Sequence, residues 1–454
     1  MKILHYFLGF PPYRTGGLTK FAYDLMQTQQ KNGDKVFALW PGKIGFLKDK
    51  KIKIKERKKI DKIQNFEVIN PLPVPLDEGI SNIKAYTRKC DKNVYKELLE
   101  KLKPDVIHIH TLMGLHKEFI DVALENKIKI FFTAHDYFGI CPKVVLYRDN
   151  RTCDNDLKCE KCIECNYSAL SLNKIKIMQG MLYRKIKNFG IIKSLRQKHR
   201  KNFFKENSNL KNEEDNIIAE REKKAEEYRK LRQYYTEMLE KIDIIHFNST
   251  LTKEVYLKYI KPKNYVVLNI THKDISDNRK NKYLESKKMR FTFLASTKPY
   301  KGFYMVKNVL DDIYKMKTYD FELNVYGNVL EKSEYMNVYE NGFNQSDLAE
   351  IFSKTDMLIA PSLWYETFGF TVLEALSYDV PVLVSENVGA KDIVGKCGVI
   401  VKANDERDLK QKIECLDKDK ILQMKQNILD TFEIPSWEEF CEKIRKLYEG
   451  IQWN

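Results

Sequence analysis

Short apolar runs alternate with stretches of helical spacing along most of this chain. In the first part, "KILHYFLGF" (2–10) and "DKVFALWP" (34–41) enclose a stretch whose apolar residues recur at intervals of three and four and which ends at Gly33. Later apolar runs repeat this order of buried strand, turn and helix, at 104–111, 127–136 and 242–250. Such an order predicts a doubly wound α/β domain with a mainly parallel sheet.

The same order starts afresh near residue 290 and continues through runs at 290–297, 320–327, 356–362, 380–385 and 397–402. A polar stretch without periodicity, 272–286, separates the two sets, and 454 residues exceed what one hydrophobic core usually supports. We therefore predict two Rossmann-like domains, at 1–275 and 286–434. A C-terminal helix at 435–454, opened by Ser436 and Glu439 in capping-box spacing, is expected to return to the first domain.

A segment that is predicted to be helical interrupts the first domain at 166–241. Its first part, 172–205, carries eleven Lys and Arg and no acidic residue, and its apolar residues lie three and four apart at Ile175, Met178, Leu182, Ile186 and Phe189. Two interpretations are open. The segment is either a basic amphipathic helix on an anionic membrane surface, or a helix that packs its apolar stripe on the domain and exposes its lysines.

Charge is unevenly divided between the two halves of the chain. Residues 286–454 hold 22 Lys and Arg against 27 Asp and Glu, whereas the remaining residues hold 57 against 36. The first half is expected either to face an anionic partner or to carry solvated lysines. No interleaving of aromatic and basic residues supports nucleic-acid binding. Because no apolar run is long enough to span a membrane and the first residues lack a signal cleavage site, we expect a cytoplasmic protein, at most peripheral on the inner face of the cell membrane.

Five of the nine cysteines fall within one short segment, at Cys141, Cys153, Cys159, Cys162 and Cys165. The last three are separated by two residues each, which is the spacing of metal-binding knuckles. Four of the five could hold a structural zinc ion, and unligated thiols are the alternative. No cofactor is expected for catalysis, because a tetrathiolate site has no open position.

Two glutamates stand in an otherwise apolar or small stretch, "YETFGFTVLEAL" (365–376). Glu366 lies on the loop after the predicted strand 356–362, and Glu374 lies early in the following helix. Ligands of Rossmann-like units bind outside the carboxyl ends of the strands, and a carboxylate can accept hydrogen bonds from two vicinal sugar hydroxyls. The pair therefore predicts a site for the two sugar rings of a nucleotide sugar. For Glu374, a favourable position near a helix N-terminus is the alternative explanation.

This stretch and its continuation to residue 385, together with "YKGF" (300–303), "PPYRTGG" (11–17) and "KPDVIHIHT" (103–111), resemble the retaining glycosyltransferase family 4. The resemblance extends to about residue 440, apart from the insertion. It implies the GT-B fold, in which two Rossmann-like domains face each other across a cleft. It also implies transfer of a hexosyl or N-acetylhexosaminyl group from a UDP or GDP sugar to a glycan or lipid-linked glycan hydroxyl, of the kind used in bacterial surface polysaccharide assembly.

The resemblance also implies roles for individual residues. Glu366 and His135 are expected beside the donor sugar and Lys301 at the pyrophosphate, and these three form the candidate catalytic group. Glu374 is expected at the ribose hydroxyls and Phe343 beside the base. The full set of expected donor-binding residues is Gly16, Gly17, Ser296, Lys298, Lys301, Phe343, Glu366, Phe368, Gly369, Phe370 and Glu374.

Three positions depart from the family pattern. Ser296 stands where an arginine is common, so Lys298 would have to supply the second positive charge, and Asp379 and Ala390 replace usual glycines. Alternatives to a transferase are therefore a non-catalytic glycosyltransferase-like subunit or glycan-binding partner, and a GT-B epimerase or phosphorylase. Of His108 and His110, one is expected near the cleft and the other in the core or at the surface.

Overall fold

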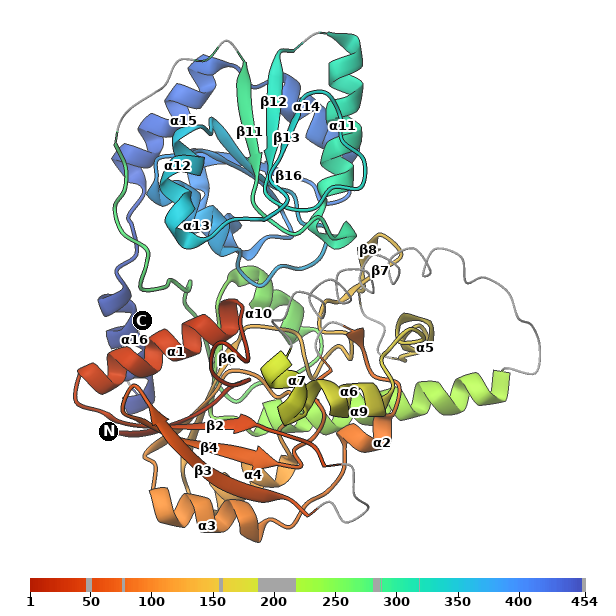
Figure 1. Cartoon of the computed structure of the whole chain (residues 1–454), viewed down its shortest axis with the longest axis vertical. Helices are drawn as coiled ribbons and strands as arrows, with labels where there is room; N and C mark the ends of the chain where they lie inside the picture. The colour runs from red at the N-terminus through yellow and green to blue at the C-terminus, as the bar shows by residue number, and fades with distance from the viewer. Residues whose placement is uncertain are drawn as a thin grey trace.

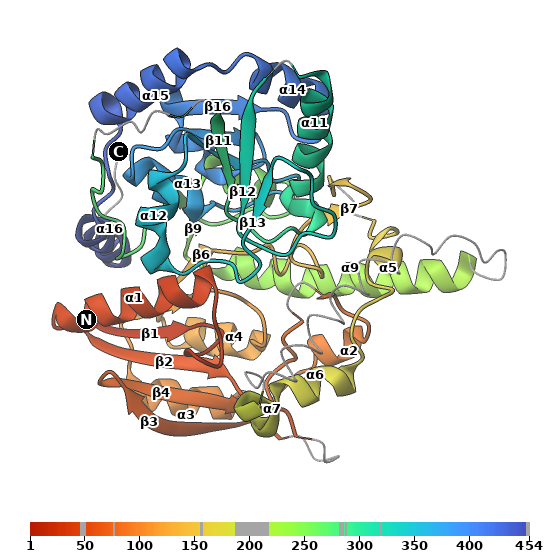
Figure 2. The same cartoon turned by 45° about the horizontal axis from the view of Figure 1, so that its top comes forward.

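The computed structural model describes residues 1–45, 51–75, 78–154, 158–186, 218–280, 286, 288–317 and 319–450. Figures 1 and 2 show two α/β domains stacked on one another, the N-terminal one drawn in red to green and the C-terminal one in green to blue. Each domain is built around its own sheet, in which parallel pairing dominates. The prediction of two Rossmann-like α/β domains is thereby confirmed.

The N-terminal sheet has eight strands in the order β10-β9-β6-β5-β1-β2-β4-β3. Its strands are β1 (Lys2–Tyr6), β2 (Lys35–Pro41), β3 (Lys53–Ile60), β4 (Ile63–Ile69), β5 (Val106–Ile109), β6 (Lys129–Ala134), β9 (Ile244–Phe247) and β10 (Tyr265–Val267). Only the edge strand β3 pairs antiparallel with its neighbour. The central strands are buried on both faces, which explains their nearly continuous apolar runs.

Helices cover both faces of this sheet: α1 (Gly17–Lys31), α2 (Ile83–Tyr86), α3 (Asn93–Leu102), α4 (Lys117–Glu125) and α10 (Thr250–Leu257). Side chains alternate between the two faces of β1. Leu4 and Tyr6 pack in a cluster with residues of α3 and α4. Ile3 packs instead with Phe21 of α1.

Between β6 and β9 the chain forms the short hairpin β7 (Tyr147–Arg148) and β8 (Arg151–Thr152) and the helix α5 (Cys162–Cys165). The inserted segment 166–241 follows and contains α6 (Leu172–Gln179), α7 (Met181–Ile186) and α9 (Ile218–Lys241). Helix α9 packs on α2, α4 and α5. Of the basic stretch 172–205, the part from 187 onward, with Phe189, lies outside the described residues. No helix in the described part of the chain is long and apolar enough to cross a membrane.

The C-terminal sheet has six parallel strands in the order β13-β12-β11-β14-β15-β16. They are β11 (Met289–Phe293), β12 (Phe321–Val325), β13 (Met336–Val338), β14 (Met357–Ala360), β15 (Val382–Ser385) and β16 (Gly398–Val401). The α-helices are α11 (Phe303–Met316), α12 (Leu348–Ser353), α13 (Phe370–Ser377), α14 (Glu406–Glu414) and α15 (Lys418–Thr431). Short 3₁₀ turns are η2 (Pro299–Lys301), η3 (Gln345–Asp347), η4 (Gly389–Ile393) and η5 (Gly395–Cys397).

The last helix, α16 (Trp437–Glu449), leaves the C-terminal domain and packs beside α1 of the N-terminal domain (Figures 1 and 2). Ser436 caps it by accepting a hydrogen bond from the Glu439 amide. Trp437 donates a hydrogen bond from Nε1 to Thr28 Oγ1 of α1 at 2.8 Å. One apolar cluster includes Phe21 of α1, Val372 of α13 and Phe440 of α16, so the two domains and α16 share a core.

Candidate functional site

The candidate site lies at the carboxyl ends of two adjacent strands of the C-terminal sheet. The loop after β11 leads to Lys301, and the loop after β14 leads through Glu366 to α13. At β11 the strand order reverses direction, which is the place where open α/β sheets bind ligands. The order of the strands in the C-terminal sheet therefore accounts for the position of the stretch that contains Glu366.

Lys301 and Glu366 form an ion pair, with 2.6 Å between Nζ and Oε1. The second oxygen of Glu366 accepts a hydrogen bond from the Ser362 hydroxyl, and Lys301 Nζ lies 5.1 Å from the Trp364 ring centroid. Burial alone would raise the pKa of the Glu366 carboxyl, but the ammonium group of Lys301 and the neighbouring donors hold it below its usual value. Because both side chains remain about a fifth exposed, at 18% and 20%, the pair is accessible to a ligand.

Gly302 makes this arrangement possible through its backbone. Its φ is +79°, and a Cβ atom there would lie 2.1 Å from the carbonyl oxygen of Pro361. Only glycine fits such a close approach at a positive φ. Gly302 therefore lets the turn that carries Lys301 pack directly against the strand end that leads to Glu366.

Glu374 is buried within α13 and faces a residue outside the predicted motif. Its Oε1 lies 3.3 Å from Nε2 of His272, and both side chains are less than a tenth exposed, at 8% and 4%. The ring of His272 packs edge-on against Phe370 at 5.1 Å. His272 Nδ1 is buried without a hydrogen-bond partner. Sequence reasoning missed His272 because it stands at the start of a stretch assigned to the linker.

The glycine pair at the start of α1 faces this region from the other domain. Gly16 has φ of +114°, and a Cβ atom on Gly17 would lie 3.5 Å from the Phe370 ring. Neither Gly16 at the N-terminus of α1 nor Gly369 at that of α13 provides a side-chain cap. The unpaired amides of both helix N-termini favour an anion nearby.

His135 stands at the carboxyl end of β6 and touches the same loop. Its carbonyl oxygen accepts a hydrogen bond from Thr367 Oγ1 at 3.1 Å, and its ring packs edge-on against Phe21 at 4.7 Å. Burial lowers the pKa of His135 to about 3, so its imidazole is neutral near pH 7. Burial also raises the pKa of the adjacent Asp136 to about 6. The loop that carries Glu366 thus contacts the backbone of His135 through Thr367, the residue after Glu366.

Other expected donor-binding residues are less directly engaged. Lys298 Nζ donates to the Tyr300 hydroxyl at 2.8 Å, and Ser296 is exposed. Phe343 is half-buried, with its ring 6.3 Å from that of Tyr326. Phe368 is buried in the core shared by the domains, and its carbonyl oxygen accepts a hydrogen bond from the amide of Ala390 at 2.7 Å.

The five clustered cysteines lie near one another, but no three of their sulfur atoms lie within 4.8 Å of one another. None of the five forms a disulfide: Cys141, Cys153, Cys159, Cys162 and Cys165. A hydrogen bond with Cys159 and burial raise the pKa of Cys162, and Arg232 lies 3.7 Å from its sulfur. Among the described residues, the only group of three ligand atoms within 4.8 Å of one another is His5, His108 and His110. The expected zinc site stays a prediction.

Both histidines of "VIHIHT" are fully buried. The sequence predicted one of them near the cleft and the other in the core or at the surface, but neither is at the surface and both lie on the same face of the sheet. Residues two apart on a strand point to the same face of the sheet. His108 and His110 accordingly stack on each other, with ring centroids 4.0 Å apart.

Two family models match the chain, one in each domain. Residues 15–154 match the model described as glycosyltransferase family 4, and residues 288–419 match the model described as glycosyl transferases group 1. The sucrose-phosphate synthase of Spinacia oleracea is 31% identical over 111 residues, covering 23% of this chain and 10% of that protein. An uncharacterised protein from the cps region of Klebsiella pneumoniae is 26% identical over 170 residues, covering 36% of this chain and 42% of that protein. The matches thus span less than half the length of either relative.

Solved structures resemble the whole chain in fold. The sucrose-phosphate synthase of Thermosynechococcus elongatus superimposes with a TM-score of 0.56 at 14% identity, covering 99% of this chain and 98% of that one. HepE of Anabaena, solved with UDP and glucose, gives a TM-score of 0.54 at 11% identity, with 99% and 100% covered. WaaG, a glycosyltransferase involved in lipopolysaccharide biosynthesis, gives 0.54 at 13% identity, again with 99% and 100% covered.

Proposed function

Because the chain is a glycosyltransferase of the GT-B fold, with family 4 and group 1 domains, we propose that it transfers a hexosyl or N-acetylhexosaminyl group from a UDP or GDP sugar, with retention of configuration. The acceptor is a hydroxyl of a glycan or lipid-linked glycan. One observation carries the proposal: the Lys301–Glu366 pair, buried Glu374 and the uncapped glycine turn of α1 converge on one region between the domains.

The diphosphate would bind where positive potential is concentrated. Lys301 supplies a point charge, and the N-termini of α1 and α13 supply unpaired amides. As the bond between the anomeric carbon and the phosphate oxygen breaks, negative charge develops on the departing diphosphate. Lys301 stabilises that charge more strongly than the charge of the bound donor, and this difference accelerates the reaction.

The two glutamates would hold the two sugar rings. Glu374 accepts hydrogen bonds from the ribose hydroxyls, with His272 holding its carboxylate in place. Glu366 accepts hydrogen bonds from the transferred sugar. The acceptor oxygen bonds to the anomeric carbon on the face that the phosphate leaves, and the acceptor proton passes to the departing phosphate. No nucleophile of the protein is required.

A screen of UDP, GDP and ADP sugars tests this proposal. We expect one donor to be consumed slowly without an acceptor, and the first-formed free sugar, followed by proton NMR in D₂O, to keep the anomeric configuration of the donor. Release of the opposite anomer would contradict the retaining mechanism. If no donor is consumed and none raises the melting temperature, the non-catalytic subunit becomes the better account, and the engagement of Lys298 by Tyr300 is the observation that favours it.

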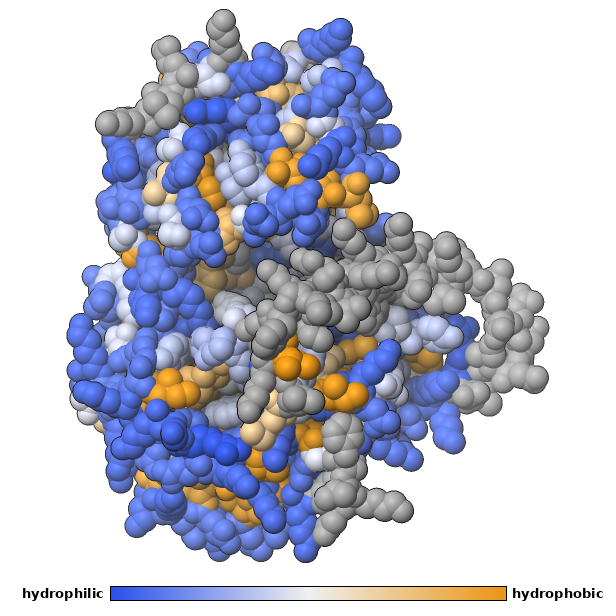
Figure 3. All heavy atoms as spheres, viewed as in Figure 1, coloured by the Kyte–Doolittle hydropathy of each residue, from blue (hydrophilic) through white to orange (hydrophobic). Residues whose placement is uncertain are grey.

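We also propose that the protein works in surface polysaccharide assembly, at the cytoplasmic face of the membrane. Apolar side chains gather over α6 and α7 (Figure 3), where Ile177 is 54% and Met181 is 49% exposed, within a stretch rich in Lys and Arg. An apolar patch bordered by basic residues suits an anionic bilayer. Sedimentation with vesicles that contain anionic lipid tests this, and absence of binding at moderate salt would contradict it.

A structural zinc ion on four of the five clustered cysteines is a further proposal. Its support is their spacing and their shared neighbourhood beside Arg232. Binding would require the thiols to move closer together and to lose their protons. Metal analysis of the purified protein decides it, since less than 0.1 zinc per chain would rule the site out.

A further inference from the structure

Five of the eight histidines of the chain, His135 among them, belong to one hydrogen-bonded network in the interior of the first domain. His5 of β1 and His108 of β5 are direct neighbours in the strand register, as are Thr133 of β6 and His246 of β9. The alternation of strand side chains places these residues on the face of the sheet that α1 and α16 cover. The network therefore joins residues of β1, β5, β6 and β9, which are far apart in sequence.

A backbone carbonyl at one end of the network fixes which atom of each hydrogen bond is the donor. Nε2 of His246 lies 2.7 Å from the carbonyl oxygen of Leu268, which can only accept, so this nitrogen carries the proton. A neutral His246 then accepts at Nδ1 from the Thr133 hydroxyl, 3.1 Å away. Because the hydroxyl has one proton, its oxygen must accept from His108 Nε2, 2.8 Å away. His108 is thus also protonated at Nε2.

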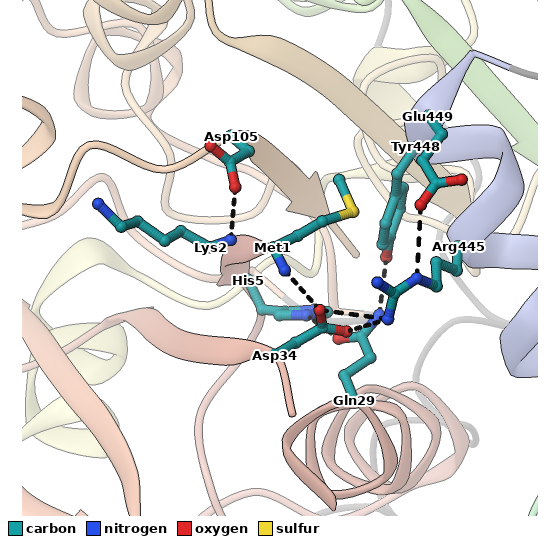
Figure 4. A network of polar contacts seen from close by, with 9 residues as sticks. All are labelled: Met1, Lys2, His5, Gln29, Asp34, Asp105, Arg445, Tyr448 and Glu449. Carbon is teal, nitrogen blue, oxygen red and sulfur yellow. Dashed lines mark hydrogen bonds and ion pairs between the residues drawn. The ribbon is translucent and has the colours of Figure 1, made fainter. Parts of the chain in front are cut away.

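The direction continues through the C-terminal helix. His108 Nδ1, now an acceptor, receives the proton of the Tyr448 hydroxyl at 2.6 Å. The phenol oxygen accepts from Gln29 Nε2 at 3.2 Å, and Gln29 Oε1 accepts from His5 Nε2 at 2.7 Å. Figure 4 shows Gln29 of α1 together with His5 and Tyr448. If the Gln29 amide were turned around, with Nε2 facing His5, donor and acceptor would be exchanged in every hydrogen bond back to the Leu268 carbonyl. That carbonyl has no proton to donate.

The last two links reach the candidate site. His5 Nδ1 accepts from His110 Nε2 at 3.0 Å, and His110 Nδ1 accepts from His135 Nε2 at 3.3 Å. Each ring donates from Nε2 and accepts at Nδ1, so His135 also carries its proton on Nε2. No hydrogen bond within the described residues occupies its Nδ1.

Burial keeps the members of the network neutral, as this direction requires. It lowers the pKa of His5 and of His246 to about 4, and lowers those of His108 and His110 well below the usual value. It raises the pKa of Tyr448, which therefore remains a phenol and a proton donor. None of the five rings carries a second proton near pH 7.

The same residues include the group His5, His108 and His110, whose ligand atoms lie within 4.8 Å of one another. A metal ion would need a free lone pair on each ring. Both nitrogens of each of these three rings are engaged with a neighbouring side chain. The hydrogen-bonded relay, not a metal, accounts for the cluster.

We propose that this relay holds His135 in the Nε2–H tautomer, so that its Nδ1 accepts a hydrogen bond from a hydroxyl of the bound sugar. Gln29, Tyr448 and the other four histidines are positioning residues, because they act on the sugar only through His135. The return of α16 to the first domain then has a role at the site, since it brings Tyr448 into the relay. The hydrogen bond from the sugar to Nδ1 rests on the proposed function, whereas the tautomer of His135 does not.

The tautomers of ¹⁵N-labelled histidines, read by long-range ¹⁵N–¹H NMR on the full-length protein without ligand, test the proposal. In the unchanged protein we expect all five relay histidines to be neutral with the proton on Nε2. A proton on Nδ1 of any of them, a charged ring at pH 7.5 or a stoichiometric metal ion bound to His5, His108 and His110 would overturn it. This NMR measurement needs no variant and no donor, so its failure is distinct from failure of the proposed function.

Two variants separate the relay from general packing. Gln29→Leu removes the acceptor of the His5 proton, and we expect His5, His110 and His135 to move to the Nδ1–H form, because a buried unpaired N–H costs more than an unpaired lone pair. Tyr448→Phe cuts the network between His108 and Gln29. His246 and His108 should stay protonated on Nε2, because they remain tied to the Leu268 carbonyl. His5, His110 and His135 lose the fixed direction and should populate both tautomers. If His135 stays entirely in the Nε2–H form in both variants, or if His246 and His108 shift as well, the relay does not set its tautomer.

Discussion

Replacing Lys301 with alanine should lower the rate of sugar transfer by about 100- to 1,000-fold, the usual cost of losing one group that stabilises charge developing in a transition state. The ammonium group of Lys301 contacts Glu366 at 2.6 Å and is the cation that we assign to the proposed diphosphate. Because the developing charge appears only as the donor bond breaks, the loss should fall mainly on kcat. Steady-state kinetics with the identified donor measure it.

Lys307→Ala is the matched control for this variant. Lys307 forms an ion pair with Asp311 at 2.7 Å, with side chains 15% and 25% exposed, close to the values for Lys301 and Glu366. It lies on α11 of the same domain, outside the proposed site. A loss in Lys307→Ala as large as in Lys301→Ala, or a Lys301→Ala enzyme with unchanged kcat, would contradict the assigned role.

Lowering the pH from 6.5 to 5 should reduce the free energy of unfolding by roughly 5 kcal/mol or more, which is comparable to the whole stability of many domains. Burial lowers the pKa of His5 and of His246 to about 4 and that of His135 to about 3. It also lowers the pKa values of His108 and His110 well below the usual value. An unfolded chain binds protons on these rings below pH 6.5, whereas the folded chain does not. Stability therefore falls as the pH falls through 6.5, by up to about 1.4 kcal/mol per pH unit for each ring, until the pH reaches the lowered pKa of that ring.

Asp136 works in the opposite direction. Its pKa is raised to about 6, so the folded chain binds its proton first and gains stability as the pH falls. One carboxyl cannot offset five imidazoles whose pKa values are all lowered. Urea unfolding at pH 7.5, 6.5, 5.5 and 5 measures the slope, and a stability that stays constant across this range would contradict the buried, neutral state of the network.

The fold was predictable because its signals are local. Each buried strand and the helix after it show their own periodicity, and a parallel sheet follows from their alternation. The stretch around Glu366 could likewise be placed, since a strand, a loop and a helix N-terminus put that glutamate at the strand ends whatever the rest of the chain does.

Contacts between distant segments were not predictable in the same way. His272 meets Glu374 across 102 positions of sequence, in a stretch without periodicity. His108 and His110 could have been assigned to one face of the sheet from their spacing alone. Their partner Tyr448 could not, because it is 340 residues from His108 and depends on where α16 packs.

Equilibrium binding of the nucleotide sugar is the most direct test of the account. Calorimetric titration should show a single site in the unchanged protein and about 10- to 100-fold weaker binding in Glu374→Ala, as expected for loss of hydrogen bonds to a charged acceptor. Glu350→Ala, which removes an exposed glutamate of α12, is the control and should bind as the unchanged protein does. Equal affinity in all three proteins would place the nucleotide elsewhere and contradict the proposed site.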